Sequence, residues 1–165
     1  MFVLGVDPGV SRCGYGCVEW ARGQTKAVAV GVLTTPPSQP LPERLAALDS
    51  DLRELIGDLR PQVVAVERLF FQTNVRTAMS VGQASGLVLA AASHAGCLVV
   101  QYTPNQVKQA VAGYGAAGKD QVQRMVQSLL GLPDVPKPAD AADALALALC
   151  HVATAPLHAR LESVK

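Results

Sequence analysis

The chain has 165 residues, of which 50% are hydrophobic and 16% are charged, and this composition excludes a wholly disordered protein. A net charge of +1 argues against a uniformly basic surface for nucleic acid, although it allows a basic patch on one face. No apolar run approaches the roughly 20 residues that span a bilayer, and the N-terminus has no basic region of a signal peptide. We therefore expect a cytoplasmic protein without a membrane segment. Its four cysteines lack zinc-site spacing and are expected to be small buried hydrophobes in a reducing compartment.

Three strands are predicted in the first part of the chain. The apolar run 2–6 ends at the turn sequence Asp7-Pro8-Gly9, and this pattern is typical of a buried strand. Residues 15–20 and 26–33 predict two further strands, joined by a hairpin turn over residues 22–24.

The remainder of the chain alternates helices with strands. Leucines that recur every three or four residues from Leu41 to Leu59 predict an amphipathic helix, and the apolar run 63–66 predicts a strand that ends at Glu67. The other predicted elements are a helix from Val75 to about Ala95 with Asn74 as its N-cap, a strand at 98–102, and helices at 103–112, 119–130 and 139–155. We expect an α/β fold with a mixed sheet flanked by helices, in one domain over residues 1–155, followed by a short C-terminal tail at 156–165.

Four acidic residues stand at the ends of predicted apolar elements. Asp7 ends the first strand and Glu67 ends the fourth, whereas Asp140 and Asp143 open the last helix at a spacing that places them on one face. Hydrolysis of a phosphodiester needs charge neutralisation and an activated water, which two hard cations about 4 Å apart can supply through carboxylate ligands. Taken together, the four acids favour a shared cation.

Each acid also has a simpler interpretation. Asp7 fits a turn without any further role. Asp140 fits a helix N-cap and Asp143 a favourable charge in the first helical turn. Glu67 is harder to explain in this way, because an unpaired carboxylate directly after a buried strand is costly.

Several sequence blocks together resemble the RuvC family of Holliday-junction resolvases. The opening Val3-Leu4-Gly5-Val6-Asp7-Pro8-Gly9 and Gly14-Tyr15-Gly16 are similar to the start of that family. The later blocks are Ala65–Phe70, Gly82–Gly86, Gln106–Gln109, Lys119–Gln123 and Ala139–Ala146. The blocks occur in family order over about residues 2 to 152, so the set is far more specific than any one block.

The resemblance implies an RNase H-like fold with a five-stranded mixed sheet flanked by helices. It also implies a homodimer that makes two symmetric, metal-dependent incisions in a four-way DNA junction during homologous recombination and DNA repair. The catalytic and metal-binding acids of the family fall on Asp7, Glu67, Asp140 and Asp143. The implied cofactor is Mg²⁺, two ions per subunit, with Mn²⁺ as an alternative, and the implied partners are the RuvA and RuvB branch-migration proteins.

Candidate DNA contacts include one aromatic and several basic residues. Phe70 and Phe71 follow Glu67, and an exposed ring beside a nuclease site could stack on an unpaired base. Both rings could equally be buried, but the family's junction-wedging phenylalanine corresponds to Phe70. The basic candidates are Arg68, Arg76, Lys108, Lys119 and Arg124, of which Lys108 and Lys119 match basic positions of the family.

The predicted helix from Val75 carries small residues at a spacing of four. Ala78, Gly82 and Gly86 could let a second helix approach closely, or could pack on the chain's own sheet. The resemblance assigns this helix to the dimer interface, and a two-fold dimer suits a junction with two equivalent strands to cut.

Three other functions compete with a junction resolvase. Gly5–Gly9 also resembles the first phosphate motif of the actin and sugar-kinase superfamily, but no second motif of that kind is present. A junction-binding scaffold would not need the intact acids. A nuclease of RNA/DNA hybrids is the main rival within the same class.

We expect Phe70→Ala to slow the cutting of a fully paired junction by roughly ten- to hundredfold, because a base stack is worth ~1–3 kcal/mol. A junction with unpaired bases at the crossover should recover much of that rate. Phe71→Ala should instead lower thermal stability, as a core truncation that costs ~3–5 kcal/mol. Rescue of Phe71→Ala alone would exchange the two roles, and rescue of neither variant would remove the wedge.

Overall fold

A single five-stranded sheet organises the chain. The computed structural model describes residues 1–68 and 75–162, with residues 75–77 and 156–162 described by their backbone alone. The strand order is β3-β2-β1-β4-β5. The strands are β1 (Phe2–Asp7), β2 (Arg12–Ala21), β3 (Gln24–Thr34), β4 (Val63–Glu67) and β5 (Leu98–Tyr102). The first three form an antiparallel meander, whereas β4 and β5 run parallel to β1, so the mixed sheet expected from the sequence is confirmed.

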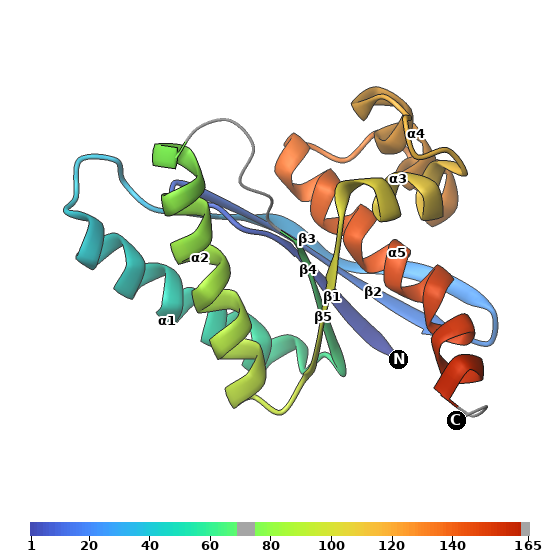
Figure 1. Ribbon diagram of the computed structural model, residues 1–165, viewed down its shortest axis with the longest axis horizontal. Helices are drawn as coiled ribbons and strands as arrows, with labels where there is room; N and C mark the ends of the chain where they lie inside the picture. The colour runs from blue at the N-terminus through green and yellow to red at the C-terminus, as the bar shows by residue number, and fades with distance from the viewer. Residues whose placement is uncertain (69–74, 163–165) are drawn as a thin grey trace.

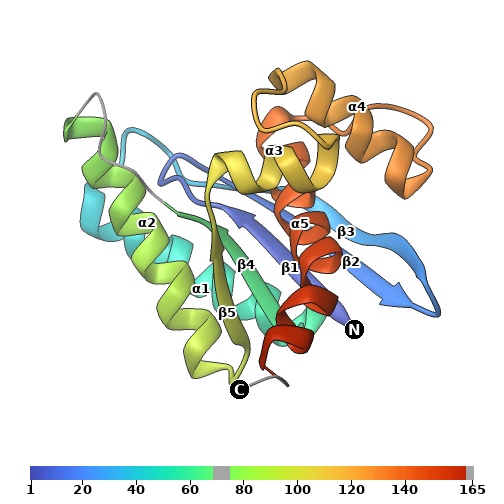
Figure 2. The ribbon, with the colours of Figure 1, turned by 45° about the vertical axis from the view of Figure 1, so that its right-hand side comes forward.

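Helices cover both faces of this sheet (Figure 1). One face carries α1 (Leu41–Leu59) and α2 (Val75–His94), and the other carries α3 (Pro104–Ala112), α4 (Lys119–Leu130) and α5 (Ala139–Glu162). The turned view in Figure 2 shows α5 crossing the sheet near β1, with α1 and α2 on the other side of the strands, at the left of the view. Within the described residues, no helix is both long and apolar enough to cross a membrane.

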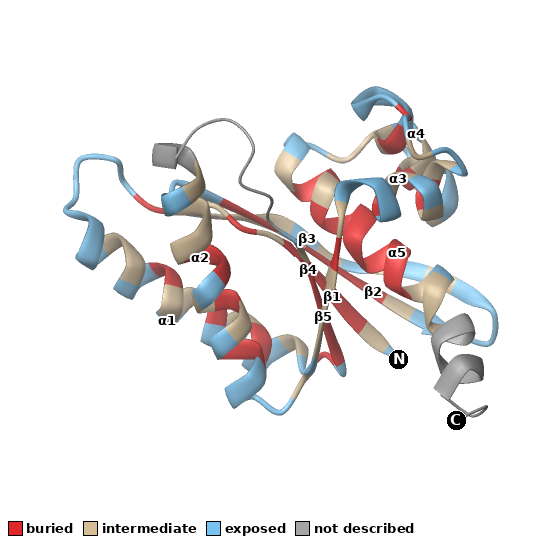
Figure 3. Ribbon diagram, viewed as in Figure 1, coloured by how far each residue is buried: buried red, intermediate tan, exposed pale blue. Residues whose placement is uncertain are grey.

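The sheet separates two hydrophobic cores, because neighbouring residues of a strand point to opposite faces. On β1, Val3 faces α3, α4 and α5, whereas Leu4 and Val6 face α1 and α2. Figure 3 shows the buried residues gathered along the strands and along the helix sides that face them. All four cysteines are free thiols. Cys13, Cys17 and Cys150 are buried as expected, whereas Cys97 is only partly buried.

Several element boundaries differ from those predicted, and β2 begins at Arg12 instead of at residue 15. The β2–β3 turn has only two residues, Arg22 and Gly23, both with positive φ, and Gln24 already pairs with Ala21. This tight geometry suits the twist of the two strands. The last helix continues through Pro156 to Glu162 instead of ending near residue 155. Asn74, the predicted cap of α2, lies outside the described residues.

Glycines on β1 and β2 let α5 lie directly on the sheet. A Cβ atom at Gly5 would collide with the carbonyl oxygen of Ala144, and one at Gly14 would collide with that of Asp140. A Cβ at Gly16 would come within 2.7 Å of the Leu145 side chain. Any larger residue at these positions would force α5 away from the sheet.

We expect Gly5→Ala to destabilise the fold by at least ~1–3 kcal/mol, because the new methyl group meets the backbone of α5. Gly57→Ala is the matched control, since no atom lies within 4 Å of a Cβ built there. It should stabilise α1 by about 0.5–1 kcal/mol. Urea denaturation of both variants measures the difference, and equal stabilities would contradict the close packing of α5.

Candidate active site

Two of the acids end neighbouring strands on the same face of the sheet. The parallel pairing of β1 with β4 aligns Val6 with Val66, so Asp7 and Glu67 are the next residues along their strands. Both side chains are partly buried. Gly5 stands two residues before Asp7, and it faces α5 because it lies against Ala144. Ala65 stands two residues before Glu67, and it belongs to the hydrophobic core on the α5 side of the sheet. Strand alternation therefore turns Asp7 and Glu67 towards α5 as well.

Helix α5 brings the other two acids to this end of the sheet. Asp140 and Asp143 lie in its first two turns, on the face that includes Ala144. Gly14, which pairs with Asp7 across β1 and β2, touches the Asp140 backbone. The fold thus gathers acids from three separate parts of the chain, as the sequence predicted.

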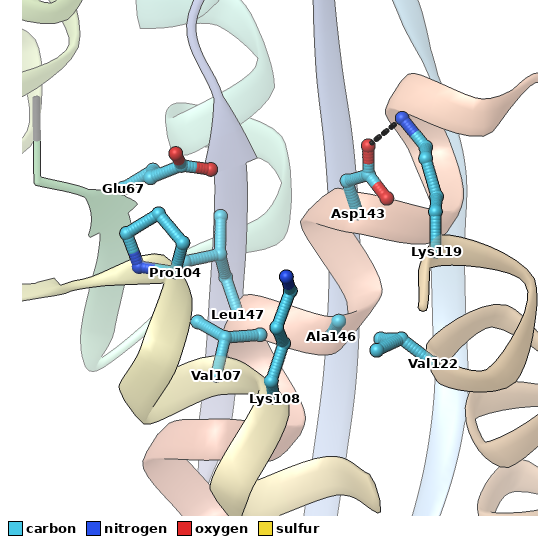
Figure 4. A pocket seen from close by; sticks show the side chains of 9 residues that line it. All are labelled: Glu67, Pro104, Val107, Lys108, Lys119, Val122, Asp143, Ala146 and Leu147. Atoms are coloured by element: carbon cyan, nitrogen blue, oxygen red, sulfur yellow. Dashed lines mark ion pairs between the residues drawn. The ribbon is translucent and has the colours of Figure 1, made fainter. Parts of the chain in front are cut away.

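Each acid of α5 forms an ion pair with a basic residue from another element. The Lys119 ammonium at the start of α4 donates to an Asp143 carboxylate oxygen at 2.7 Å, as Figure 4 shows. The Arg12 Nε at the start of β2 donates to Asp140 at 2.8 Å. Both basic side chains remain more than half exposed.

A pocket of about 240 Å³ lies between these elements. Glu67 and Asp143 line it from opposite sides, and Lys108 of α3 points into it between them (Figure 4). Its floor is apolar, formed by Val107, Val122, Ala146 and Leu147. The pocket therefore combines two carboxylates with two lysines at an open surface.

Burial and neighbouring carboxylates make Asp7 and Glu67 harder to ionise. Burial, and then the negative charges of Glu67, Asp143 and Asp140, raise the pKa of Asp7 to about 7, against a smaller opposing effect of Lys119. Burial and the charge of Asp143 also raise the pKa of Glu67. The hydrogen bond to Asp143 raises the pKa of Lys119. The site is short of positive charge, which a bound cation would supply.

The donor set fits a hard divalent cation, because all four acids offer carboxylate oxygens. In the described part of the chain, however, no three Asp, Glu, His or Cys side chains converge closely enough to ligate one ion. The ion pairs with Arg12 and Lys119 account for part of this, since each holds an oxygen of one α5 acid. The carboxylate side chains would have to rotate to bind a common ion.

The predicted DNA contacts have different outcomes. Lys108 and Lys119 both border the pocket, and Lys119 is paired with Asp143, a contact that no sequence pattern indicates. Arg68 and Arg124 are exposed. Phe70 and the side chain of Arg76 lie outside the described residues.

Sequence reasoning missed Arg12 and the glycines that seat α5. Arg12 follows a turn, and no periodicity or motif indicates that it reaches across to Asp140, 128 residues away. The glycines carried a usable signal, because glycines within strands often mark a close approach of another backbone.

Comparison with solved structures defines the class of protein. The chain superposes on T. thermophilus RuvC in complex with Holliday junction substrate with a TM-score of 0.90 and 41% identity, covering 96% of each chain. The yeast mitochondrial Holliday junction resolvase Ydc2 is only 16% identical, but its TM-score of 0.67 over 92% of this chain and 78% of that chain supports the same fold. The architecture is therefore the RNase H-like fold of DNA junction nucleases.

Sequence comparison then gives the family. The model of the family described as crossover junction endodeoxyribonuclease RuvC matches residues 3–151. A protein of that name from Moorella thermoacetica is 52% identical over 164 residues, covering 99% of this chain and 98% of its own length. The chain belongs to the RuvC family.

We expect the metal-free protein to lose stability as the pH rises from about 4 to about 7. The folded chain holds the Asp7 proton to about pH 7, whereas an unfolded chain releases it near 3.8, so ionisation in that window favours unfolding. Asp7→Asn should remove the part of this dependence that Asp7 contributes, while Glu67 keeps its own part. The variant should have a higher Tm than the parent in EDTA above pH 7, by about 2–4 °C for each kcal/mol. Calorimetry across this pH range measures the effect. Glu54→Gln, at an exposed position of α1, is the control, and parallel curves for the parent and Asp7→Asn would contradict the assignment.

Proposed function

We propose that this RuvC-family nuclease cleaves DNA at the cluster formed by Asp7, Glu67, Asp140 and Asp143. The cofactor that fits these ligands is Mg²⁺, two ions per subunit, with Mn²⁺ as an alternative. When bound, the ions would neutralise charge on the phosphate and activate a water molecule. The main support for this proposal is that three separate chain segments place four acids at one open end of the sheet. Burial and the charges of the other three acids raise the pKa of Asp7 there.

The proposed substrate is a four-way DNA junction. It is supported by family membership and by the similarity to the T. thermophilus relative, which is seen with a Holliday junction substrate. Lys108 and Lys119 border the acids and would bind the phosphates of the strand to be cut. A local basic edge of this kind explains how a chain with a net charge of only +1 can hold DNA.

The apolar floor of the pocket has a different role from its charged rim. Val107, Val122 and Leu147 form an apolar floor beneath the carboxylates, so no polar side chain of the floor competes for the charged atoms. Charge interactions are stronger in such surroundings than in open solvent. The same floor keeps α3, α4 and α5 packed together beneath the acids.

We also propose that two copies of the chain act as a homodimer through α2. Met79 on that helix is 61% exposed, and Gly86 and Ala90 are exposed as well. A side chain at Gly86 would meet no atom of its own chain within 4 Å. This surface is apolar, and the small residues Gly86 and Ala90 let a second helix approach closely. Two-fold symmetry would give one active site for each of two equivalent strands.

The family resemblance supports further proposals about the setting of the reaction. The partners would be the RuvA and RuvB branch-migration proteins, and the protein would act in the cytoplasm during homologous recombination and DNA repair. Co-purification with each of the two proteins, with and without junction DNA, tests the partnership.

We expect Asp7→Asn and Glu67→Gln to lower the cleavage rate by roughly 10³-fold or more, because loss of a ligand charge removes several kcal/mol of metal-assisted catalysis. Junction binding should persist. Single-turnover assays on a junction, a plain duplex and an RNA/DNA hybrid, with Mg²⁺ or with EDTA, measure both the rate and the substrate preference. Asp49→Asn is the control, because Asp49 lies on α1, at the face of the sheet opposite α5, and pairs with Arg53. Full activity of Asp7→Asn would refute the site, and preference for the hybrid would refute the substrate.

We expect Gly86→Leu to weaken the dimer at least tenfold, which corresponds to about 1.4 kcal/mol, while the circular dichroism spectrum stays native. Light scattering over a concentration series measures the change. Gly57→Leu places the same bulk at an open position of α1 and should leave the dimer intact. A dimer of unchanged strength in Gly86→Leu would move the interface to another surface.

A further inference from the structure

The Arg12 side chain is placed between the carboxylate cluster and solvent. Its Nε donates to an oxygen of Asp140 at 2.8 Å, and 51% of the side chain is exposed. Within the described residues, no hydrogen bond from its two terminal amino groups accompanies this contact. One edge of the guanidinium is thus held against an acid of the proposed active site, while its amino groups are left for another acceptor.

The backbone that carries Arg12 is fixed on the side of the sheet that α1 covers. Arg44 of α1 donates from Nε to the Thr35 hydroxyl at 2.9 Å and from a terminal amino group to the Ser11 hydroxyl at 2.6 Å. The buried Thr35 hydroxyl in turn donates to the Val10 carbonyl oxygen at 2.6 Å. These bonds tie the loop between β1 and β2 to α1, so Arg12 starts from a well-defined position.

The ion pair alone gives little reason for such a placement. A pair between side chains exposed to this degree contributes at most about 1 kcal/mol to stability. The planar guanidinium, however, can hold two oxyanions at once through different N–H groups, which a lysine ammonium does less selectively. A phosphodiester drawn to the acids by bound cations would lie close to the free edge of Arg12.

We propose that Arg12 binds a phosphate of the DNA strand lying across the carboxylate cluster through its terminal amino groups, while its Nε holds Asp140. Arg12 is then a substrate-binding residue that joins the DNA backbone directly to one of the acids. It lies on β2, whereas Lys108 and Lys119 approach from α3 and α4, so the strand is held from two sides. This inference rests on the proposed function, because it takes the cluster to be the place where DNA binds.

The test is the salt dependence of junction binding by the full-length protein in EDTA. Arg12→Gln should lower the affinity roughly tenfold and reduce the slope of log affinity against log salt by about 0.9, as expected for one lost phosphate contact. Arg12→Lys keeps the charge and should retain the native slope. Arg22→Gln removes an exposed arginine from the distant hairpin tip and should change neither quantity by a comparable amount.

A second measurement locates the phosphate. Neutral methylphosphonates placed one at a time around the crossover should reveal a position that weakens binding of the parent but not of Arg12→Gln. If Arg12→Gln melts early, the uncharged Arg12→Met, which keeps the apolar stem, takes its place in this comparison. A native slope in Arg12→Gln, an equal change in Arg22→Gln, or additive effects at every methylphosphonate position would overturn the proposal.

The two proposals fail in different ways. If the cluster is not the cleavage site, Asp7→Asn cuts junctions normally whatever the behaviour of Arg12→Gln. If only the role of Arg12 is wrong, Asp7→Asn is inactive while Arg12→Gln keeps its salt dependence.

Discussion

The contact between α5 and the centre of the sheet is the constraint on which the site depends. At Gly5 and Gly14 the helix backbone reaches the strand backbone without intervening side chains. This approach sets the height of Asp140 and Asp143 above Asp7, because all three are attached to the elements in contact. The same helix carries most of its apolar residues into one of the two cores. The geometry of the acids is thus fixed by the packing that stabilises the fold.

Four neighbouring carboxylates repel one another, and the basic residues of the fold offset this repulsion only in part. Arg12 and Lys119 each hold one acid of α5, whereas Asp7 and Glu67 lie deeper and have raised pKa values. The chain therefore keeps a site that is stable enough to form but still attracts positive charge. Exposed basic partners suit such a site, since they pair with an acid at a lower desolvation cost than a buried base would.

Much of this arrangement could be predicted from the sequence, because it depends on local patterns. Apolar runs gave all five strands, and the leucine spacing of α1 and the Thr103-Pro104 start of α3 gave their bounds. The acids were found because each stands at an element end. The partner of Asp140 could not be found in this way, since an ion pair across 128 residues leaves no periodic trace. The predicted end of α5 near residue 155 was wrong, since the helix continues through Pro156, a residue type that more often ends a helix.

The alternation of side chains along β1 also limits how the chain can change in length. Asp7 reaches the acids only because it shares a face with Gly5 and Val3, and one residue added to or lost from this strand would turn it to the opposite core. The tip of the β2–β3 hairpin at Arg22 and Gly23 carries no such restriction, because it is an exposed turn beyond both cores. Inserted segments, fluorescent labels or affinity tags are therefore best placed at this tip, where they leave the register of the central strands intact.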